Sequence, residues 1–197
     1  MPAELRQICV FCGSKTGNTD RYRNHAEQLG RLLVETGHGL VYGGGSVGLM
    51  GVIADSVLAA GGQVIGVIPE ALATKELLHT NVSDMRVVRS MHDRKATMAE
   101  LADAFIAMPG GLGTFEELFE AVTWAQLGFH RKNIGLLNTD GFFDPLLSLI
   151  DHSIEQGFIK PEYRDLIVVN DEPGSLLESL EGHQLPEVRR WMGPELA

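Results

Sequence analysis

The sequence predicts an α/β protein built on a doubly wound, Rossmann-like parallel sheet of about seven strands, with helices on both faces. Short apolar runs alternate with longer segments of helical periodicity along the chain. Several of the apolar runs end in glycine, as strands do where they lead into a loop and a helix. The length of 197 residues suits one substantial core. We therefore expect one domain over residues 1–197, with its core at about 8–180 and a polar C-terminal tail at 186–197.

Each expected strand is a short, mostly apolar run bounded by glycine, proline or polar residues. In chain order the expected strands are 8–11, 40–42, 64–68, 85–88, 104–107, 133–137 and 166–169. Between them, apolar residues recur three or four positions apart, which is typical of amphipathic helices. The expected helices are 20–36, 49–60, 91–102, one that continues to about 127, 144–156 and 173–180. The segment 70–81 has too weak a pattern to assign.

Composition narrows the classes of partner. The net charge of −10 argues against binding to nucleic acid or to an anionic membrane. A small anionic ligand is compatible with it, because local dipoles can hold such a ligand. No apolar run reaches membrane-spanning length, and residues 1–6 lack the apolar centre of a signal peptide, so we expect a cytoplasmic protein.

Several kinds of catalytic or metal site find no support. Cys9 and Cys12 form a C-x-x-C pattern, but it lies in an expected strand, where an odd spacing sends the two thiols to opposite faces. We interpret both as buried small residues, and the seven histidines show no metal-ligand spacing, so no metal is expected. The chain has no G-x-S-x-G elbow, so the sequence does not support a hydrolase with a serine triad. It has no lysine in a P-loop, so it does not support hydrolysis of nucleoside triphosphates either.

The stretch 108–117, MPGGLGTFEE, contains the strongest indication of chemistry. Its glycines Gly110, Gly111 and Gly113 lie between an expected strand and an expected helix, where backbone N–H groups and the helix dipole favour a phosphate. Thr114 and Glu117 also match a capping box, which only starts a helix. We favour the cap for Thr114, whereas the Glu117 carboxylate could cap the helix and still face a ligand.

An earlier glycine run has two interpretations. Gly43, Gly45 and Gly48 form G-x-G-x-x-G after an expected strand, and Glu70 lies where a dinucleotide site places its ribose-binding acid. Close packing of a strand against its helix requires the same glycines, and we favour that alternative.

The third feature is the segment 91–95, MHDRK. One face of the expected helix carries Met91, Arg94, Lys95 and Met98, so two cations interrupt an apolar stripe. These cations lie near the start of the helix, where the helix dipole disfavours positive charge. Their side chains either extend past the core to solvent or face an anion at the neighbouring glycine loop.

Together, MHDRK at 91–95 and PGGLGTFEE at 109–117 resemble the LONELY GUY (LOG) family of cytokinin riboside 5′-monophosphate phosphoribohydrolases. The likeness extends over about 8–180, since the early Cys-Gly-Ser and Tyr-Gly-Gly-Gly segments also fit. The resemblance implies cleavage of the N-glycosidic bond of a nucleoside 5′-monophosphate without a cofactor, in a homodimer with the site close to the dimer contact. It implies catalytic roles for Arg94 and Glu117. The substrate-binding residues that it implies are Gly13, Ser14, Gly44, Glu76, Met91, Lys95, Gly110, Gly111, Gly113, Thr114, Glu116 and Thr123.

The residue types suit this chemistry. Breaking a ribosyl–base bond builds positive charge on the sugar. A carboxylate such as Glu117 can either stabilise that charge or activate the attacking water. Arg94 could orient Glu117, the leaving base or the phosphate.

Two other functions compete. Some relatives are labelled lysine decarboxylases, but that reaction requires a lysine that binds pyridoxal phosphate, and Lys95 has no recognisable motif for this cofactor around it. A nucleotide- or cofactor-binding carrier would use the glycine loops but would not need the pairing of Arg94 with Glu117.

Overall fold

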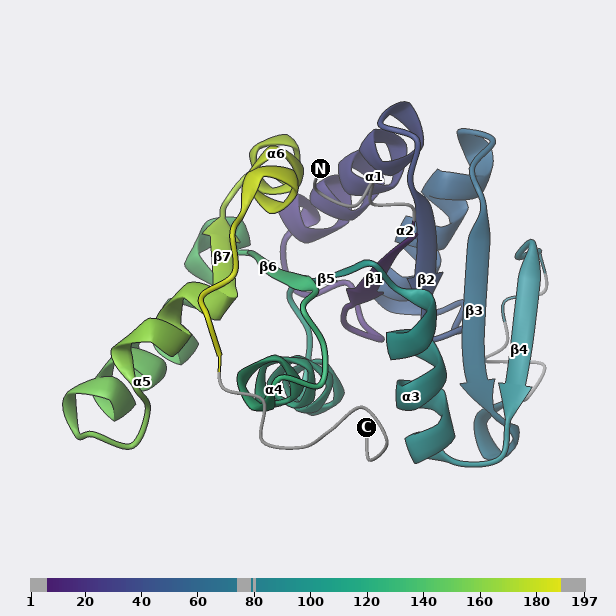
Figure 1. Cartoon of the computed structure of the whole chain (residues 1–197). Coiled ribbons are helices and arrows are strands. Elements are labelled where there is room, and N and C mark those ends of the chain that lie inside the picture. Colours follow the sequence, from purple (N-terminus) through teal and green to yellow (C-terminus); the bar gives the residue numbers. More distant parts are fainter. Residues whose placement is uncertain (1–6, 74–78, 80, 189–197) are drawn as a thin grey trace.

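The computed structural model describes residues 7–73, 79 and 81–188. Seven parallel strands form one sheet in the order β4-β3-β2-β1-β5-β6-β7, which confirms the expected fold class (Figure 1). The strands are β1 Gln7–Phe11, β2 Gly39–Tyr42, β3 Val64–Pro69, β4 Asp84–Val88, β5 Ala104–Ala107, β6 Asn133–Leu137 and β7 Ile167–Asn170. The helices are α1 Asp20–Glu35, α2 Gly48–Ala59, α3 Met91–Leu101, α4 Leu112–Leu127, α5 Asp144–Glu155 and α6 Pro173–Gly182.

These elements lie within about two residues of the expected bounds, because their apolar periodicity is local and strong. Three short 3₁₀ helices, Glu70–Leu72, Thr139–Gly141 and Pro161–Leu166, complete the described structure. The first of them begins the segment that the sequence left unassigned.

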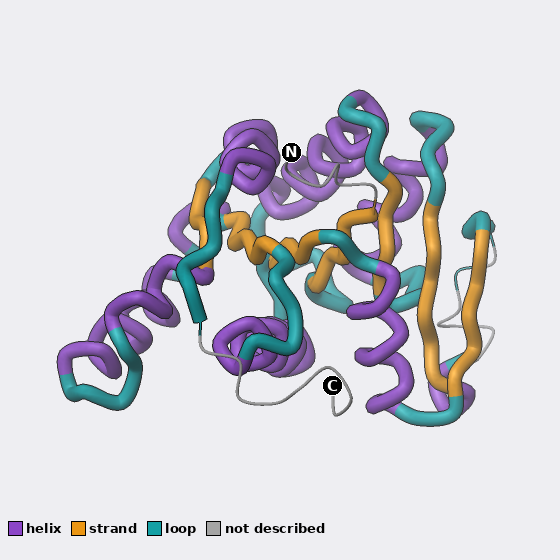
Figure 2. Tube along the Cα trace, in the orientation of Figure 1, coloured by secondary structure: helices purple, strands orange, loops and turns teal. Residues whose placement is uncertain are grey.

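Helices cover both faces of the sheet (Figure 1, Figure 2). Apolar residues of α1, α2 and α6 pack on one face, and those of α3, α4 and α5 on the other. Strand β1 contributes alternate residues to the two cores, so Cys9 packs with α3 and α4 whereas Cys12, one residue past the strand, packs with α1 and α2. Both thiols are buried and free, as expected.

Strand order reverses between β1 and β5, because β2 to β4 extend the sheet from one side of β1 and β6 and β7 extend it from β5. The loops after these two strands meet directly, and the Gly13 N–H donates to the carbonyl of Pro109 at 3.1 Å. In doubly wound sheets a ligand crevice forms at this reversal, beyond the carboxyl ends of the strands. The two loops are those that carry the Cys-Gly-Ser and Pro-Gly-Gly motifs.

The capping-box prediction for Thr114 is wrong. Helix α4 begins at Leu112 with Gly111 at its N-cap, and no side chain bonds to that cap, so Thr114 lies inside the first turn and is buried. The glycine loop itself turns into the helix, which makes a side-chain cap unnecessary for starting α4. The first N–H groups of α4 are therefore available to a ligand rather than to a threonine hydroxyl.

Leu185, just before the C-terminal tail, and Val188, within it, pack on the fold. Leu185 and Val188 pack against the core on the α4 face, and Arg131 donates to the carbonyl of Leu185 at 3.4 Å. Within the part of the chain that the structure describes, no helix is long and apolar enough to cross a bilayer.

Candidate functional site

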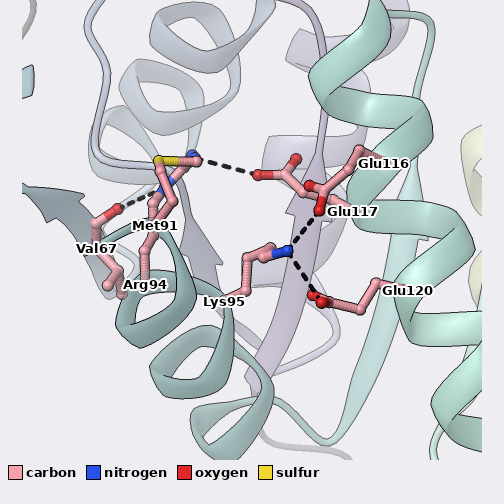
Figure 3. A network of polar contacts seen from close by, with 7 residues as sticks. All are labelled: Val67, Met91, Arg94, Lys95, Glu116, Glu117 and Glu120. Atoms are coloured by element: carbon pink, nitrogen blue, oxygen red, sulfur yellow. Dashed lines mark hydrogen bonds and ion pairs between the residues drawn. The ribbon is translucent and has the colours of Figure 1, made fainter.

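Arg94 and Glu117 converge between α3 and α4 (Figure 3). The Arg94 Nη1 and Glu117 Oε1 atoms are 3.2 Å apart, and the two side chains are only 12% and 10% exposed. Arg94 Nε also donates to the carbonyl of Val67, in β3, at 3.1 Å. This second bond fixes the guanidinium in one orientation, so it presents a defined face to the carboxylate.

The surrounding backbone makes room for Arg94. Helix α3 starts at a Ser90 cap, whose hydroxyl accepts from the Asp93 N–H at 3.0 Å, and this places Arg94 in the first turn, over the ends of β2 and β3. A Cβ on Gly43 would lie 2.0 Å from Arg94 Nη2. Any side chain at position 43 would therefore displace the guanidinium, which explains one glycine of the early run.

Lys95 is held by a second pair of carboxylates (Figure 3). Its Nζ donates to Glu116 Oε1 and, at 2.9 Å, to Glu120 Oε1. Burial lowers the pKa of Lys95, but the two hydrogen bonds and the nearby negative charges outweigh it, so the pKa lies above its ordinary value. Lys95 is therefore a protonated bridge between the two glutamates.

Burial is the main cause of an unusual pKa at Glu117. Desolvation raises the pKa of this carboxyl above its ordinary value of 4.5, Arg94 and Lys95 act against the rise, and Glu116 and Glu120 add to it. A buried carboxyl with a raised pKa and one fixed cation is a common arrangement for an acid–base group in a catalytic site.

The glycine loop adjoins a hollow of about 370 Å³. A Cβ on Gly110 would lie 2.1 Å from Thr114 Oγ1 and 2.9 Å from the Gly13 nitrogen, so only glycine fits there. A Cβ on Gly111 or Gly113 would meet no atom within 4 Å, so these two residues border open space. The residues lining the hollow are Gly13, Ser14, Lys15, Thr16, Gly17, Tyr22, Leu49, Pro109, Gly110, Gly111 and Phe142.

Sequence comparison identifies the family. The model of the family described as "Possible lysine decarboxylase" matches residues 50–180. The rice (Oryza sativa subsp. japonica) probable cytokinin riboside 5′-monophosphate phosphoribohydrolase LOGL2 is 51% identical over 179 residues, covering 91% of this chain and 73% of the relative. The Arabidopsis thaliana enzyme LOG2 is 50% identical over 179 residues, covering 91% of this chain and 84% of the relative. The chain belongs to the LOG family.

Solved structures share the fold of this LOG-family chain. A molybdenum cofactor binding protein from Rippkaea orientalis superposes with a TM-score of 0.66 at 24% identity, covering 89% of this chain and 95% of that one. A molybdenum cofactor (Moco) carrier protein from Chlamydomonas reinhardtii has a TM-score of 0.67 at 21% identity, covering 90% and 96%. At such low identity the likeness extends to the fold alone.

Lys95 does not suit the reaction that the decarboxylase description of the family names. Pyridoxal phosphate binds covalently to an unprotonated lysine amine. Lys95, the lysine beside the Arg94–Glu117 pair, donates to two carboxylates, and its pKa is raised. Its ammonium is therefore held in the protonated form, which is not nucleophilic.

The structure brings some of the other predicted residues together and not others. Gly13 and Ser14 line the hollow with Gly110 and Gly111. The sulfur of Met91 lies 4.0 Å from Arg94 Nη1.

Two predicted residues do not line the hollow, and one falls outside the described part. Gly44 has a positive φ of 73°, and its carbonyl accepts from the His79 N–H at 3.1 Å. Thr123 is exposed on α4, between one and two helical turns beyond Glu117. Glu76 lies outside the described residues.

Gly48, from the G-x-G-x-x-G run, packs against the β1–α1 loop, where a Cβ would lie 2.2 Å from the carbonyl carbon of Ser14. That contact favours the packing interpretation of the run over a dinucleotide site.

Sequence reasoning missed several residues at the site. Glu120 binds Lys95, and Lys15, Tyr22 and Phe142 line the hollow. Glu120 could have been found from its helical spacing to Glu116, four positions earlier. Lys15 could have been found from its place directly after the Cys-Gly-Ser at the end of β1. Tyr22 and Phe142 are distant in sequence and carry no such indication.

Proposed function

We propose that this chain hydrolyses the N-glycosidic bond of nucleoside 5′-monophosphates, AMP or cytokinin riboside 5′-monophosphates, to free base and ribose 5-phosphate. The observation that carries the proposal is the buried Arg94–Glu117 pair, whose atoms are 3.2 Å apart, with Glu117 on the helix that follows the glycine loop after β5. The names of relatives about 50% identical support the same reaction.

In the proposed mechanism the nucleotide lies across the glycine loops. The N–H groups at the start of α4 bind the 5′-phosphate, with Gly13 and Ser14 opposite them. This remote binding energy positions the ribose beside Glu117. As the C1′–N bond breaks, its electron pair leaves with the base, which takes up a proton from solvent water, and positive charge develops on the sugar. The Glu117 carboxylate stabilises that charge and accepts a proton from the water that attacks C1′.

Arg94 has two effects in this mechanism. Its charge favours the ionised form of Glu117 against the effect of burial, and its fixed guanidinium orients the carboxylate. Lys95 keeps Glu116 and Glu120 in place on the same face of α4. The other expected substrate contacts, Glu76, Met91, Gly44 and Thr123 among them, belong to this proposal.

The direct test is to incubate purified protein with AMP and to follow free adenine and ribose 5-phosphate by chromatography. We expect both products in equal amounts. Binding of AMP without release of adenine, at high protein concentration and over long times, would favour the carrier alternative.

We further propose that the whole chain acts as one domain and assembles as a homodimer through α4. Leu112 is 86% exposed and Phe119 is 40% exposed, on the same helix as Glu117. The two residues are seven positions apart and so share one face of α4, and burial of both between subunits would remove apolar surface from water. Light scattering should give about twice the chain mass of 21.5 kDa, and Leu112→Asp should lower it. We place the activity in the cytoplasm, where free thiols such as Cys9 and Cys12 stay reduced.

A further inference from the structure

The charged groups around Glu117 leave no free cation for a phosphate. Arg94 pairs with Glu117, and Lys95 pairs with Glu116 and Glu120, so two cations face three carboxylates. A 5′-phosphate carries a charge of about −1.5 to −2 at pH 7. Placed against this group alone, the phosphate would meet a net negative charge.

The hollow lined by Gly110 and Gly111 has a different charge. Lys15 is the only charged residue among those that line it, and no carboxylate is among them. No hydrogen bond or ion pair of the Lys15 side chain occurs among the described residues, and the side chain is exposed. Its charge is therefore available to a ligand in the hollow.

The backbone of Lys15 is held firmly in this position. A Cβ on Gly48, at the start of α2, would lie 2.3 Å from the Lys15 nitrogen, so α2 packs directly against the β1–α1 loop. On the other side, the carbonyl of Lys15 lies 3.0 Å from the Cβ position of Gly13. Gly13 in turn bonds to Pro109, next to Gly110. These close approaches place the Lys15 backbone beside both α2 and the glycine loop, and Lys15 lines the hollow there.

We propose that Lys15 is the cation that binds the 5′-phosphate, with its ammonium on one side of the phosphate and the amides of the glycine loop on the other. This inference rests on the proposed function for its substrate and adds a residue to the site. In this arrangement Arg94 and Lys95 serve the ribose end of the nucleotide and take no part in phosphate binding. Lys15 contributes to binding before and during the reaction equally, so its loss should raise KM and leave kcat nearly unchanged.

The test compares Lys15→Met with Lys15→Arg and with a matched control, Lys160→Met. Lys160 lies in the loop before Pro161–Leu166 and its side chain is 66% exposed; its Nζ lies 3.6 Å from Glu162 Oε1 and 5.7 Å from the centre of the Tyr163 ring. For Lys15→Met we expect the KM for AMP and the inhibition constant of inorganic phosphate both to rise about ten-fold or more, the size expected for a lost hydrogen bond to a charged group. Lys15→Arg should restore most of the binding, and Lys160→Met should match the wild type.

Two results would overturn the proposal. The first is that the KM and the phosphate inhibition constant of Lys15→Met stay within about two-fold of the wild type. The second is that both constants rise as much in Lys160→Met as in Lys15→Met, which would indicate a general effect of net charge. Calorimetric titration of each variant with inorganic phosphate gives the same comparison without turnover. A wild-type protein that binds phosphate through Lys15 but releases no adenine from AMP would refute the hydrolase proposal and leave the Lys15 site standing.

Discussion

Replacing Glu117 by glutamine should abolish base release without harming the fold. The substitution keeps the shape of the side chain and an oxygen that can accept from Arg94 Nη1, now 3.2 Å from Glu117 Oε1. It removes the negative charge that stabilises the sugar cation and the base that accepts a proton from water. The loss of one acid–base group costs roughly 10²- to 10⁴-fold in rate.

The effect on stability should be small, because two contributions oppose each other. The raised pKa of Glu117 shows that burial disfavours its ionised form, and the amide avoids this cost. Arg94 loses its ionic partner but keeps its bond to the Val67 carbonyl. We expect the free energy of unfolding to change by about 1 kcal/mol or less, which for a chain of this size corresponds to a shift in Tm of about 2–4 °C.

The pH dependence provides a separate check on Glu117. An acid whose pKa is higher in the folded state than in the unfolded state contributes stability below its unfolded pKa and loses that contribution as the pH rises through the folded pKa. The wild type should therefore lose stability relative to Glu117→Gln as the pH rises from below 4.5. Base release by the wild type should fall as the pH drops through the raised pKa, since the carboxylate form is the active one.

The assay is release of adenine from AMP, with urea unfolding of each protein measured in parallel. Glu178→Gln, the same substitution at an exposed position on α6, is the matched control and should keep full activity. If Glu117→Gln kept more than a tenth of wild-type turnover, the catalytic assignment would be wrong. Loss of activity together with a drop in Tm of ten degrees or more would point to a structural role instead.

Three further substitutions or measurements test the rest of the site. Arg94→Met removes a charge that lowers the pKa of Glu117, so this pKa should rise further and the acid limb of the pH–rate profile should move to higher pH. Turnover should also fall by roughly 10²-fold or more. An acid limb at the wild-type pH would contradict the pairing of Arg94 with Glu117. Gly110→Ala should lower the free energy of unfolding by about 1–3 kcal/mol in urea, because the added Cβ would lie 2.1 Å from Thr114 Oγ1. Gly111→Ala is the matched control: its Cβ would have no atom within 4 Å, so stability should be nearly unchanged. Purified protein incubated with pyridoxal phosphate and desalted should show no absorbance band of lysine-bound cofactor in the visible range, and a strong band would revive the decarboxylase function.

Local patterns in the sequence were sufficient to predict the fold class and the approximate bounds of the elements. Apolar spacing distinguishes strand from helix within a few residues, and glycines mark where each strand ends. The PGGLGTFEE and MHDRK segments also pointed to Arg94 and Glu117 as a pair. Capping was the exception: Thr114 and Glu117 matched a capping box, but the backbone of the glycine loop starts α4 at Leu112.

What only the tertiary structure decided is which charges neutralise each other. Lys95 pairs with Glu116 and Glu120, which lie on α4, 21 and 25 positions along the chain, while its contact with the substrate stays a prediction. The distance between Arg94 and Glu117, and the burial that raises the pKa of Glu117, likewise depend on how α3 and α4 pack on the sheet. Helical periodicity is a property of neighbouring residues, so the sequence contains it directly. Electrostatic pairing and desolvation depend on distances between segments remote in sequence, and these distances exist only once the chain has folded.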